Sequence, residues 1–431
     1  MSSGPTIELG ELRHEPESEA LPRPPRGAGR PLRCALVLLL VLAGLAASTP
    51  VQRRSAVVVV SARLGAEAFV AGDLFVLVEP TVEQGRQRRL AAYRLPGGEP
   101  AWQAPLPVNG RFWTVTAMAG TLLVTGYDAT SDGAANVTMV VDRATGALRW
   151  QQPGAAVELA DGNLLLASGD WDRAGTLRAV DRCCGTLRWR ADVAPGEVNL
   201  RFTEARADRI VHNDAAGRVE VRDASTGEVL VTKDLWGPAD GRPQSVQVVG
   251  DLLLTIGGTP PVVSAYGLDR LDRRWRTPVD QALYAMDCGR VVCLQTRSGG
   301  LRTLDAASGR PGWTDDRWAS VTPSHGQLIA SAQSSAGPGT EDLSLLDPAT
   351  GRVIGELGRW DLVRPARLDD PVIGLRRHPD GGLLVAELDL STGTVRPLDV
   401  LTDAAGDCQT GGDRLICRRR DGSYGLWQLR R

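Results

Sequence analysis

Several residue types on which enzymes commonly rely are scarce in this chain of 431 residues. It has four histidines, and its single lysine is Lys233. His212, His325 and His378 lie far apart, without a spacing typical of a metal site. The sequence has neither a Gly-x-Ser-x-Gly elbow nor a Gly-x-x-x-x-Gly-Lys-Ser/Thr loop, so hydrolase and phosphate-loop chemistry lack support. We therefore assign no catalytic residue and no metal ligand.

Blocks of like charge are also missing. The chain has 49 Lys and Arg against 51 Asp and Glu, for a net charge of −2, and its basic residues are spread along the whole length. A nucleic-acid partner needs a concentrated basic surface, because contacts to phosphates supply most of the affinity. We expect no nucleic-acid partner.

Glycine, proline and apolar residues are abundant. The chain has 49 Gly and 27 Pro, and 42% of its residues are hydrophobic. Many short strands joined by tight turns need such a composition more than helices do. The composition predicts an all-β protein.

The N-terminal part differs from the rest. Residues 1–33 are rich in Pro, Gly, Glu and Arg, which predicts a disordered tail. An uncharged run then extends from Cys34 to Val51, just enough for a helix to cross about 30 Å of hydrocarbon. We expect a signal-anchor transmembrane helix over 34–52; a cleavable signal peptide is the alternative, because Gly44 and Ala46 are small. More arginines before the run than after it favour a cytoplasmic N-terminus and an extracellular remainder, 55–431.

One pattern recurs along that remainder: an apolar residue, Asp, two or three small or polar residues, Gly, and then Trp or an aliphatic residue about four positions later. The glycines of the clear copies are separated by 39, 42, 82, 42 and 42 residues, and the 82 includes a degenerate copy at Leu268-Asp269, so the period is about 41. The paired turn residues are Asp142 and Gly146, Asp181 and Gly185, Asp223 and Gly227, Asp305 and Gly309, Asp347 and Gly351, and Asp389 and Gly393.

Each copy reads as a small antiparallel sheet. The Asp side chain can accept backbone N–H groups two or three residues on, and Gly adopts positive φ, so the motif closes a hairpin. A single small sheet cannot bury its apolar faces alone and must stack on its neighbours in a closed ring. The eight motifs predict a β-propeller of eight four-stranded blades, and a half-unit at 413–427 is expected to pair with residues 56–60 and close the ring. This extra half-unit leaves a count of seven or nine blades open.

The Asp-x-x-Thr-Gly-x-x-x-Trp motif resembles the tryptophan-docking repeat of the quinoprotein, or pyrroloquinoline-quinone-like, propeller family. That family includes quinoprotein alcohol dehydrogenases and the non-enzymatic outer-membrane assembly lipoprotein BamB. The resemblance implies a propeller in which each motif tryptophan packs across a blade interface onto the next motif. The tryptophans at this position are Trp102, Trp150, Trp189, Trp275 and Trp313.

Six cysteines follow the apolar run. Cys288 and Cys293 flank one predicted turn, and Cys408 and Cys417 flank another, so each pair could form a cross-strand disulfide in an oxidising compartment. Buried free thiols are the alternative. The adjacent Cys183 and Cys184 resemble the cysteine ring of quinoprotein alcohol dehydrogenases, but they lie in a hairpin turn and not where a central cofactor would sit.

These observations predict a membrane-anchored, extracytoplasmic β-propeller that binds or scaffolds a protein or cell-envelope ligand without catalysis. One alternative is a quinoprotein dehydrogenase, for which the resemblance implies bound pyrroloquinoline quinone and calcium. A second is a BamB-like envelope assembly factor. A fold is shared by many functions, so the repeat alone does not name the ligand.

Overall fold

The computed structural model describes residue 38 and residues 57–80, 88–106, 110–128, 135–170, 172–236, 243–332, 341–363, 370–379, 381–411 and 413–429. The chain divides into two compact units, Met1–Gln52 and Arg53–Arg431. Apart from Leu38, the predicted tail and the predicted anchor lie outside the described residues. Within the described ranges, no helix combines the length and the apolar character that crossing a membrane requires.

The second unit consists of antiparallel strands, which confirms the all-β prediction. Six of its sheets have four strands that are consecutive along the chain. They are β2 (Glu67–Ala71), β3 (Leu74–Val78), β4 (Arg89–Arg94) and β5 (Glu99–Pro105); β6 (Gly110–Met118), β7 (Thr121–Asp128), β8 (Ala135–Asp142) and β9 (Leu148–Pro153); β10 (Ala155–Glu158), β11 (Leu164–Asp170), β12 (Arg173–Val180) and β13 (Leu187–Val193); β14 (Gly196–Thr203), β15 (Arg206–Asp214), β16 (Arg218–Asp223) and β17 (Val229–Asp234); β18 (Ser245–Val249), β19 (Leu252–Gly257), β20 (Val262–Gly267) and β21 (Arg273–Pro278); and β22 (Ala282–Cys288), β23 (Val291–Thr296), β24 (Leu301–Asp305) and β25 (Pro311–Asp315).

Two further sheets depart from this plan. A sheet of seven strands contains β26 (Trp318–Ser324), β27 (Gln327–Ala332), β28 (Glu341–Leu346), β29 (Val353–Val363), β30 (Val372–Arg377), β31 (Leu383–Asp389) and β32 (Thr394–Leu401). A sheet of four strands joins the two ends of the unit and contains β33 (Ala404–Gly411), β34 (Arg414–Arg419), β35 (Tyr424–Gln428) and β1 (Val57–Val60).

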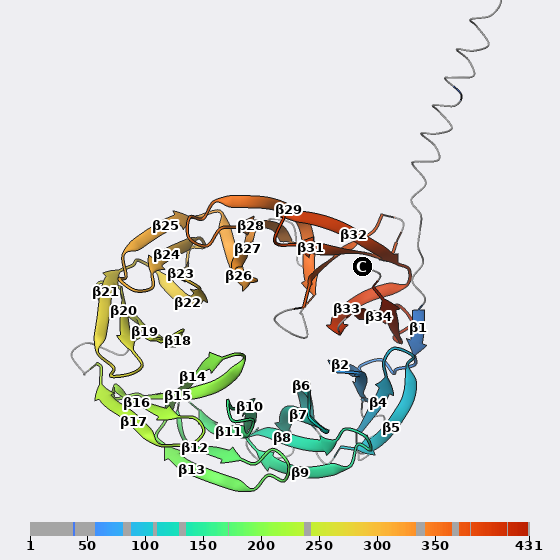
Figure 1. Ribbon diagram of the computed structural model, residues 1–431, viewed down its shortest axis with the longest axis horizontal. Helices are drawn as coiled ribbons and strands as arrows, with labels where there is room; N and C mark the ends of the chain where they lie inside the picture. The colour runs from blue at the N-terminus through green and yellow to red at the C-terminus, as the bar shows by residue number, and fades with distance from the viewer. Residues whose placement is uncertain are drawn as a thin grey trace, which may run out of the picture. The chain divides into compact units, whose positions relative to one another are not determined.

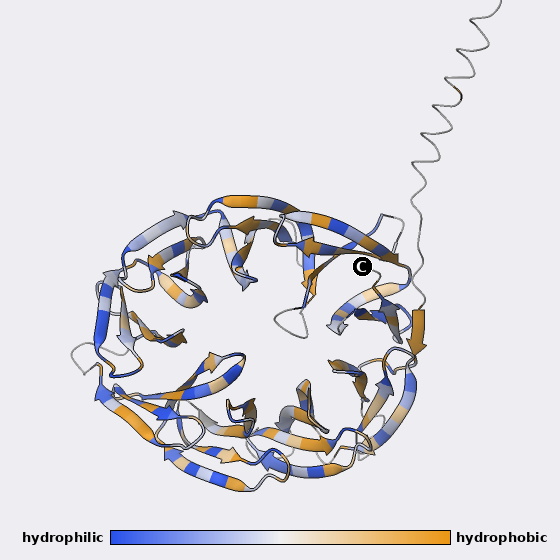
Figure 2. Ribbon diagram, in the orientation of Figure 1, coloured by the Kyte–Doolittle hydropathy of each residue, from blue (hydrophilic) through white to orange (hydrophobic). Residues whose placement is uncertain are grey.

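The sheets of this unit lie around a common centre, as Figure 1 shows. The first strand of each sheet, such as β2, β6 or β10, is nearest the centre, and the last, such as β5, β9 or β13, is on the outside. The second strands are buried on both faces; in β3, which reads Leu-Phe-Val-Leu-Val, every residue is buried. In the outer strands, more exposed and less exposed residues alternate. Figure 2 shows hydrophilic and hydrophobic residues following each other along β13.

The core lies between neighbouring sheets and not within any one of them. One cluster joins Val76 of β3 to Leu122 and Val124 of β7, and another joins Leu254 of β19 to Leu294 of β23. All of these side chains are almost fully buried. Since burying one such side chain contributes about 1.5–3 kcal/mol, each sheet depends on its neighbours for stability.

The strand β29 takes part in two four-stranded groups. Its residues from Val353 to Trp360 pair with β28, and Asp361 to Val363 pair with β30. When the seven-stranded sheet is divided at this strand, the described strands form nine four-stranded units, namely seven separate sheets and two that share β29. That is one more than the eight motifs predicted, because the C-terminal half-unit is completed on both sides.

The completing strands are β33 on the inner side and β1 on the outer side. Val57 pairs with Trp427 and Val60 with Tyr424, so residues from the two ends of the unit share one sheet, as the sequence predicted. The ring of Tyr424 also packs against Phe75 of β3, with 5.3 Å between ring centroids. This shared sheet closes the ring, so that each described unit has a neighbour on both sides.

Candidate functional site

The Asp and Gly of the repeat build the turn that precedes each outer strand. Asp142 accepts the backbone N–H groups of Ala144 and Thr145, both at 3.0 Å, and Gly146, at φ 74°, donates its N–H to the Asp142 carbonyl at 2.8 Å. Hydrogen bonds from Arg149 and Thr145 lower the pKa of Asp142 to about 2. The same glycine-to-aspartate bond, at 2.8–2.9 Å, closes the turns at 181–185, 223–227, 305–309, 347–351 and 389–393.

Each motif tryptophan contacts the turn of the following unit. The five indole N–H groups donate to a backbone carbonyl of that turn: Trp102 to Arg143 at 2.8 Å, Trp150 to Arg182 at 3.1 Å, Trp189 to Ser225 at 3.0 Å, Trp275 to Ala306 at 3.0 Å and Trp313 to Pro348 at 2.9 Å. Their rings lie against the turn glycines, which are Gly146, Gly185, Gly227, Gly309 and Gly351 in the same order. The arrangement matches the packing that the family resemblance implies.

The turn at Gly393 has a different neighbour. Gly355 of β29 occupies the position that holds Trp in five of the other copies, and a Cβ added at Gly393 would lie 3.0 Å from the Gly355 Cα. Backbone therefore meets backbone here, whereas Gly146, Gly185, Gly227, Gly309 and Gly351 each receive an indole. The contact lies on β29, the strand shared by two units.

The four turn-flanking cysteines form two disulfides. Cys288 is joined to Cys293, and Cys408 to Cys417. Each bond links the innermost strand of a unit to the second strand, β22 to β23 in one case and β33 to β34 in the other. These covalent links reinforce hairpins nearest the centre.

Cys183 and Cys184 are also joined to each other. They lie exposed in the turn between β12 and β13, and β13 is the outermost strand of its sheet in Figure 1. A cofactor at the centre of the ring would be far from this turn. The pair therefore does not fit the place that the cysteine ring of a quinoprotein dehydrogenase would take.

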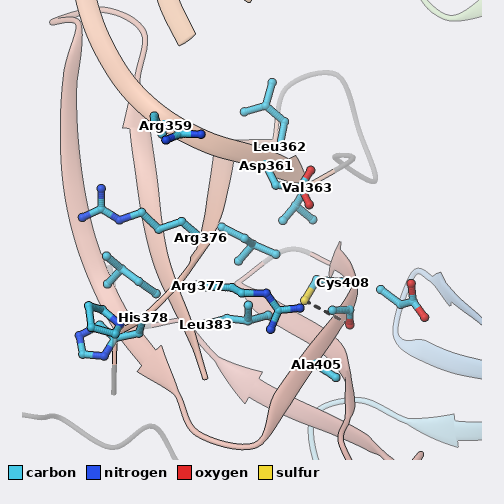
Figure 3. Close-up of a pocket in the computed structure, with 15 residues that line it drawn as sticks. Arg359, Asp361, Leu362, Val363, Arg376, Arg377, His378, Leu383, Ala405 and Cys408 are labelled. Carbon is cyan, nitrogen blue, oxygen red and sulfur yellow. Dashed lines mark hydrogen bonds between the residues drawn. The ribbon is translucent and has the colours of Figure 1, made fainter. Parts of the chain in front are cut away.

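A cavity of about 1200 Å³ lies beside the β29 crossover. Its walls come from the end of β29, from β30 and from β33 (Figure 3). The sequence of β30, Val-Ile-Gly-Leu-Arg-Arg, explains this wall, because four buried residues are followed by the exposed Arg376 and Arg377. In Figure 3, Arg377 extends toward Cys408 and Arg376 extends to the other side, as successive residues of a strand must.

Positive charge dominates this wall. Arg376 lies over the ring of Trp360, with 4.7 Å between its Cζ and the ring centroid. The two carboxylates on the lining are Asp407, which pairs with Arg418 at 3.0 Å, and Asp361, whose pKa is raised by burial and by Glu341. Among the described residues, neither Arg376 nor Arg377 has a carboxylate partner, so neither guanidinium charge is neutralised by an ion pair.

A second cavity, of about 1010 Å³, shares Leu362 and Val363 with the first. Its other walls include Val291, Pro323 and Leu328, and Cys288 of one disulfide lies on its edge. The two cavities therefore lie on either side of the end of β29. Sequence reasoning did not identify either one: the Arg-Arg-His run at 376–378 is visible in the sequence, but its position next to Cys408 depends on how the units stack.

The profile of the family described as outer membrane protein assembly factor BamB matches residues 86–252 and 173–359, which together cover more than half of the chain. The chain belongs to this family. The BamB family resemblance drawn from the repeat is thereby confirmed. The matched residues include the five motif tryptophans and the turns that they contact. A binding, scaffold or assembly role is the kind of function that this membership supports.

Several solved structures are similar to this chain. BamB from Moraxella catarrhalis has 14% identity and a TM-score of 0.39, with 62% of this chain and 81% of that one covered. The computationally designed Ika8 protein has 14% identity and a TM-score of 0.46, with 75% and 98% covered. Sqt1 from Saccharomyces cerevisiae has 10% identity and a TM-score of 0.45, with 75% and 97% covered. The comparison with curated proteins found no match.

The contact between indole and glycine can be tested with two glycine substitutions at nearly the same φ. Gly227 (φ 72°) faces Trp189, and an added Cβ would lie 2.6 Å from the indole Cδ2, whereas Gly120 (φ 70°) has open space around it. Both Gly→Ala variants carry the left-handed backbone cost of about 1–2 kcal/mol. We expect Gly227→Ala to lose about 1–3 kcal/mol more, because Trp189 must shift. Urea unfolding of both variants measures the difference, and equal losses would contradict the contact.

Proposed function

We propose that this chain is a non-catalytic binding or scaffolding module of the cell envelope. In this proposal residues 34–52 anchor it in the cytoplasmic membrane, the tail 1–33 lies in the cytoplasm, and an extracytoplasmic propeller of nine blades carries the binding surface. The BamB family match and the ring of stacked sheets support a binding role. The two disulfides agree with an oxidising compartment.

The observation that carries the proposal is the arginine-lined cavity. Arginine forms bidentate, charge-assisted hydrogen bonds with carboxylates, and these are stronger than bonds between neutral groups. Arg376 and Arg377 project from opposite faces of β30, so one small anion would not satisfy both. A protein segment with several acidic side chains fits this arrangement better, and we propose such a segment as the partner.

An assembly factor is the second candidate, and the description of the matched family favours it. Such a factor would hold a client or partner protein, which is the same physical task as scaffolding. The acidic segment proposed here would then belong to a protein of the assembly machinery.

The charge of the cavity wall provides the test. We expect a labelled oligoglutamate peptide to bind the full chain, and Arg376→Glu with Arg377→Glu to weaken binding by about tenfold or more, because each lost charge-assisted bond is worth about 1.5–3 kcal/mol. Arg273→Glu, an Arg-to-Glu change on the exposed face of the distant strand β21, is the control and should leave affinity nearly unchanged. Fluorescence anisotropy measures all three proteins.

Two outcomes of that titration would overturn the cavity assignment. One is absence of binding by the unaltered chain, and the other is an equal loss of affinity in the Arg273→Glu control. An oligolysine peptide of the same length should not bind the unaltered chain. Raising the salt concentration should weaken oligoglutamate binding, because exposed charges are screened.

The quinoprotein dehydrogenase alternative makes a separate prediction. It requires the folded ectodomain, residues 55–431, to take up pyrroloquinoline quinone and calcium in stoichiometric amounts. We expect an absorbance spectrum and a calcium analysis after incubation with the quinone to show no stoichiometric uptake. A bound chromophore that turns over an alcohol with an artificial electron acceptor would replace the binding proposal with the enzymatic one.

The membrane anchor is tested by comparing the full chain with the chain that starts at residue 55, preceded by a cleavable export signal. We expect the full chain to stay with the membrane fraction at high salt and to leave it only in detergent, whereas the shorter chain is released. Release of the full chain by salt alone would contradict the anchor.

A further inference from the structure

The turn at 181–185 differs from the other turns of the repeat in one respect. Its backbone is the same, because Gly185 has φ 69° and donates its N–H to the Asp181 carbonyl at 2.8 Å. In the other turns a Ser or Thr hydroxyl also donates to the aspartate, as Thr145 does to Asp142 at 3.0 Å and Thr350 to Asp347 at 2.8 Å. Here Cys183 and Cys184 stand in those positions.

The fold does not require this pair of cysteines. Turns of the same geometry are built at 142–146 with Ala-Thr, at 223–227 with Ser-Thr and at 305–309 with Ala-Ser. Cys183 supplies only its backbone N–H to Asp181, at 2.9 Å, and both cysteines are exposed. The Cys184 Sγ accepts a weak hydrogen bond from the Thr186 hydroxyl at 3.7 Å, but this exposed contact does not explain why two adjacent cysteines stand here.

The side chains of Asp181, Cys183 and Cys184 point to one place. Their ligand atoms, one carboxylate oxygen and two sulfurs, all lie within 4.8 Å of one another. Two sulfurs bound to one zinc-like ion, each at about 2.3 Å, can be at most about 4.6 Å apart, so small side-chain rotations are enough to bring the three donors onto one ion.

We propose that Cys183, Cys184 and Asp181 form a binding site for a thiophilic metal ion when the disulfide is reduced. Two thiolates select soft cations such as Zn²⁺ or Cd²⁺ over Mg²⁺ or Ca²⁺. Two electrons and two protons from a dithiol reductant, which is itself oxidised to a disulfide, open the Cys183–Cys184 bond. The metal ion then displaces the two thiol protons, and the exposed side of the site leaves a coordination position for water.

Charge at the turn favours a cation in the reduced form. Two thiolates and the Asp181 carboxylate carry three negative charges, while Arg182 and Arg188 carry two positive ones. The Arg188 guanidinium binds one Asp181 oxygen at 2.7 Å. The second oxygen accepts the Cys183 N–H and has a further lone pair for the ion.

The site would also act on the neighbouring unit. Trp150 of β9 donates its indole N–H to the Arg182 carbonyl in this same turn, and its ring lies against Gly185. An ion that fixes residues 181–184 therefore fixes the surface on which Trp150 packs. Binding to the folded state alone raises stability with ion concentration, so the melting temperature of the reduced protein should rise as Cd²⁺ is added.

The test begins with selective reduction of the full chain. Cys288, Cys293 and Cys417 are almost fully buried, so a mild dithiol reductant followed by alkylation should label Cys183 and Cys184 first, with the fold intact by circular dichroism. A separate reduced sample, not alkylated and freed of the reductant without air, is then dialysed to equilibrium against Cd²⁺, because alkylated thiols cannot bind the ion. We expect the reduced chain to bind one more equivalent than the oxidised chain.

Two variants assign the ion to this site. The double substitution Cys183→Ala and Cys184→Thr reproduces the Ala-Thr of the 142–146 turn, so it should fold normally and lose the additional equivalent. Asp181→Asn should weaken Cd²⁺ binding by about tenfold, and Asp142→Asn, the same change in an equivalent turn, should not. The proposal is overturned if the reduced chain takes up no additional ion, if the double variant takes up the same amount, or if the pair can be reduced only by unfolding the protein.

Discussion

The contact on which the ring depends is that of an indole lying against a glycine of the next unit. The glycine is needed twice, because its positive φ closes the turn and because a Cβ would occupy the space of the ring. The indole N–H is then satisfied by a carbonyl of the same turn, so a large apolar ring is buried without leaving its polar atom unpaired. One motif therefore defines both a hairpin and the way in which one unit meets the next.

Much of this architecture could be predicted from the sequence, since a period of about 41 residues and the Asp-to-Gly spacing are local features. Closure through β1 could also be predicted, because the half-unit at 413–427 needs a partner. The number of units was left open, since the ninth has no Asp-to-Gly motif of its own and takes its outer strand from residues 57–60. The cavity beside β29 could not be predicted from the sequence. Arg377 and Cys408 belong to different units, and only the stacking of these units brings the two residues together.

The regular contact is interrupted where the cavities lie. Gly355 replaces the tryptophan, β29 continues from one unit into the next, and Leu362 and Val363 at its end line both cavities. Units that have few large side chains between them bury less apolar surface, and the space left between them can hold a partner. The disulfides Cys288–Cys293 and Cys408–Cys417 border these two cavities and hold the inner hairpins on either side of the interruption.

Each motif tryptophan holds the turn of the following unit and not its own. Native-state hydrogen exchange of the Gly185 amide, in the unaltered chain and in Trp150→Leu, tests this relation. We expect loss of the Trp150 indole to speed exchange at Gly185 by about tenfold or more, since the turn loses its cover, while the Gly227 amide, which Trp189 still covers, exchanges as before. Unchanged exchange at Gly185, or an equal change at Gly227, would contradict it.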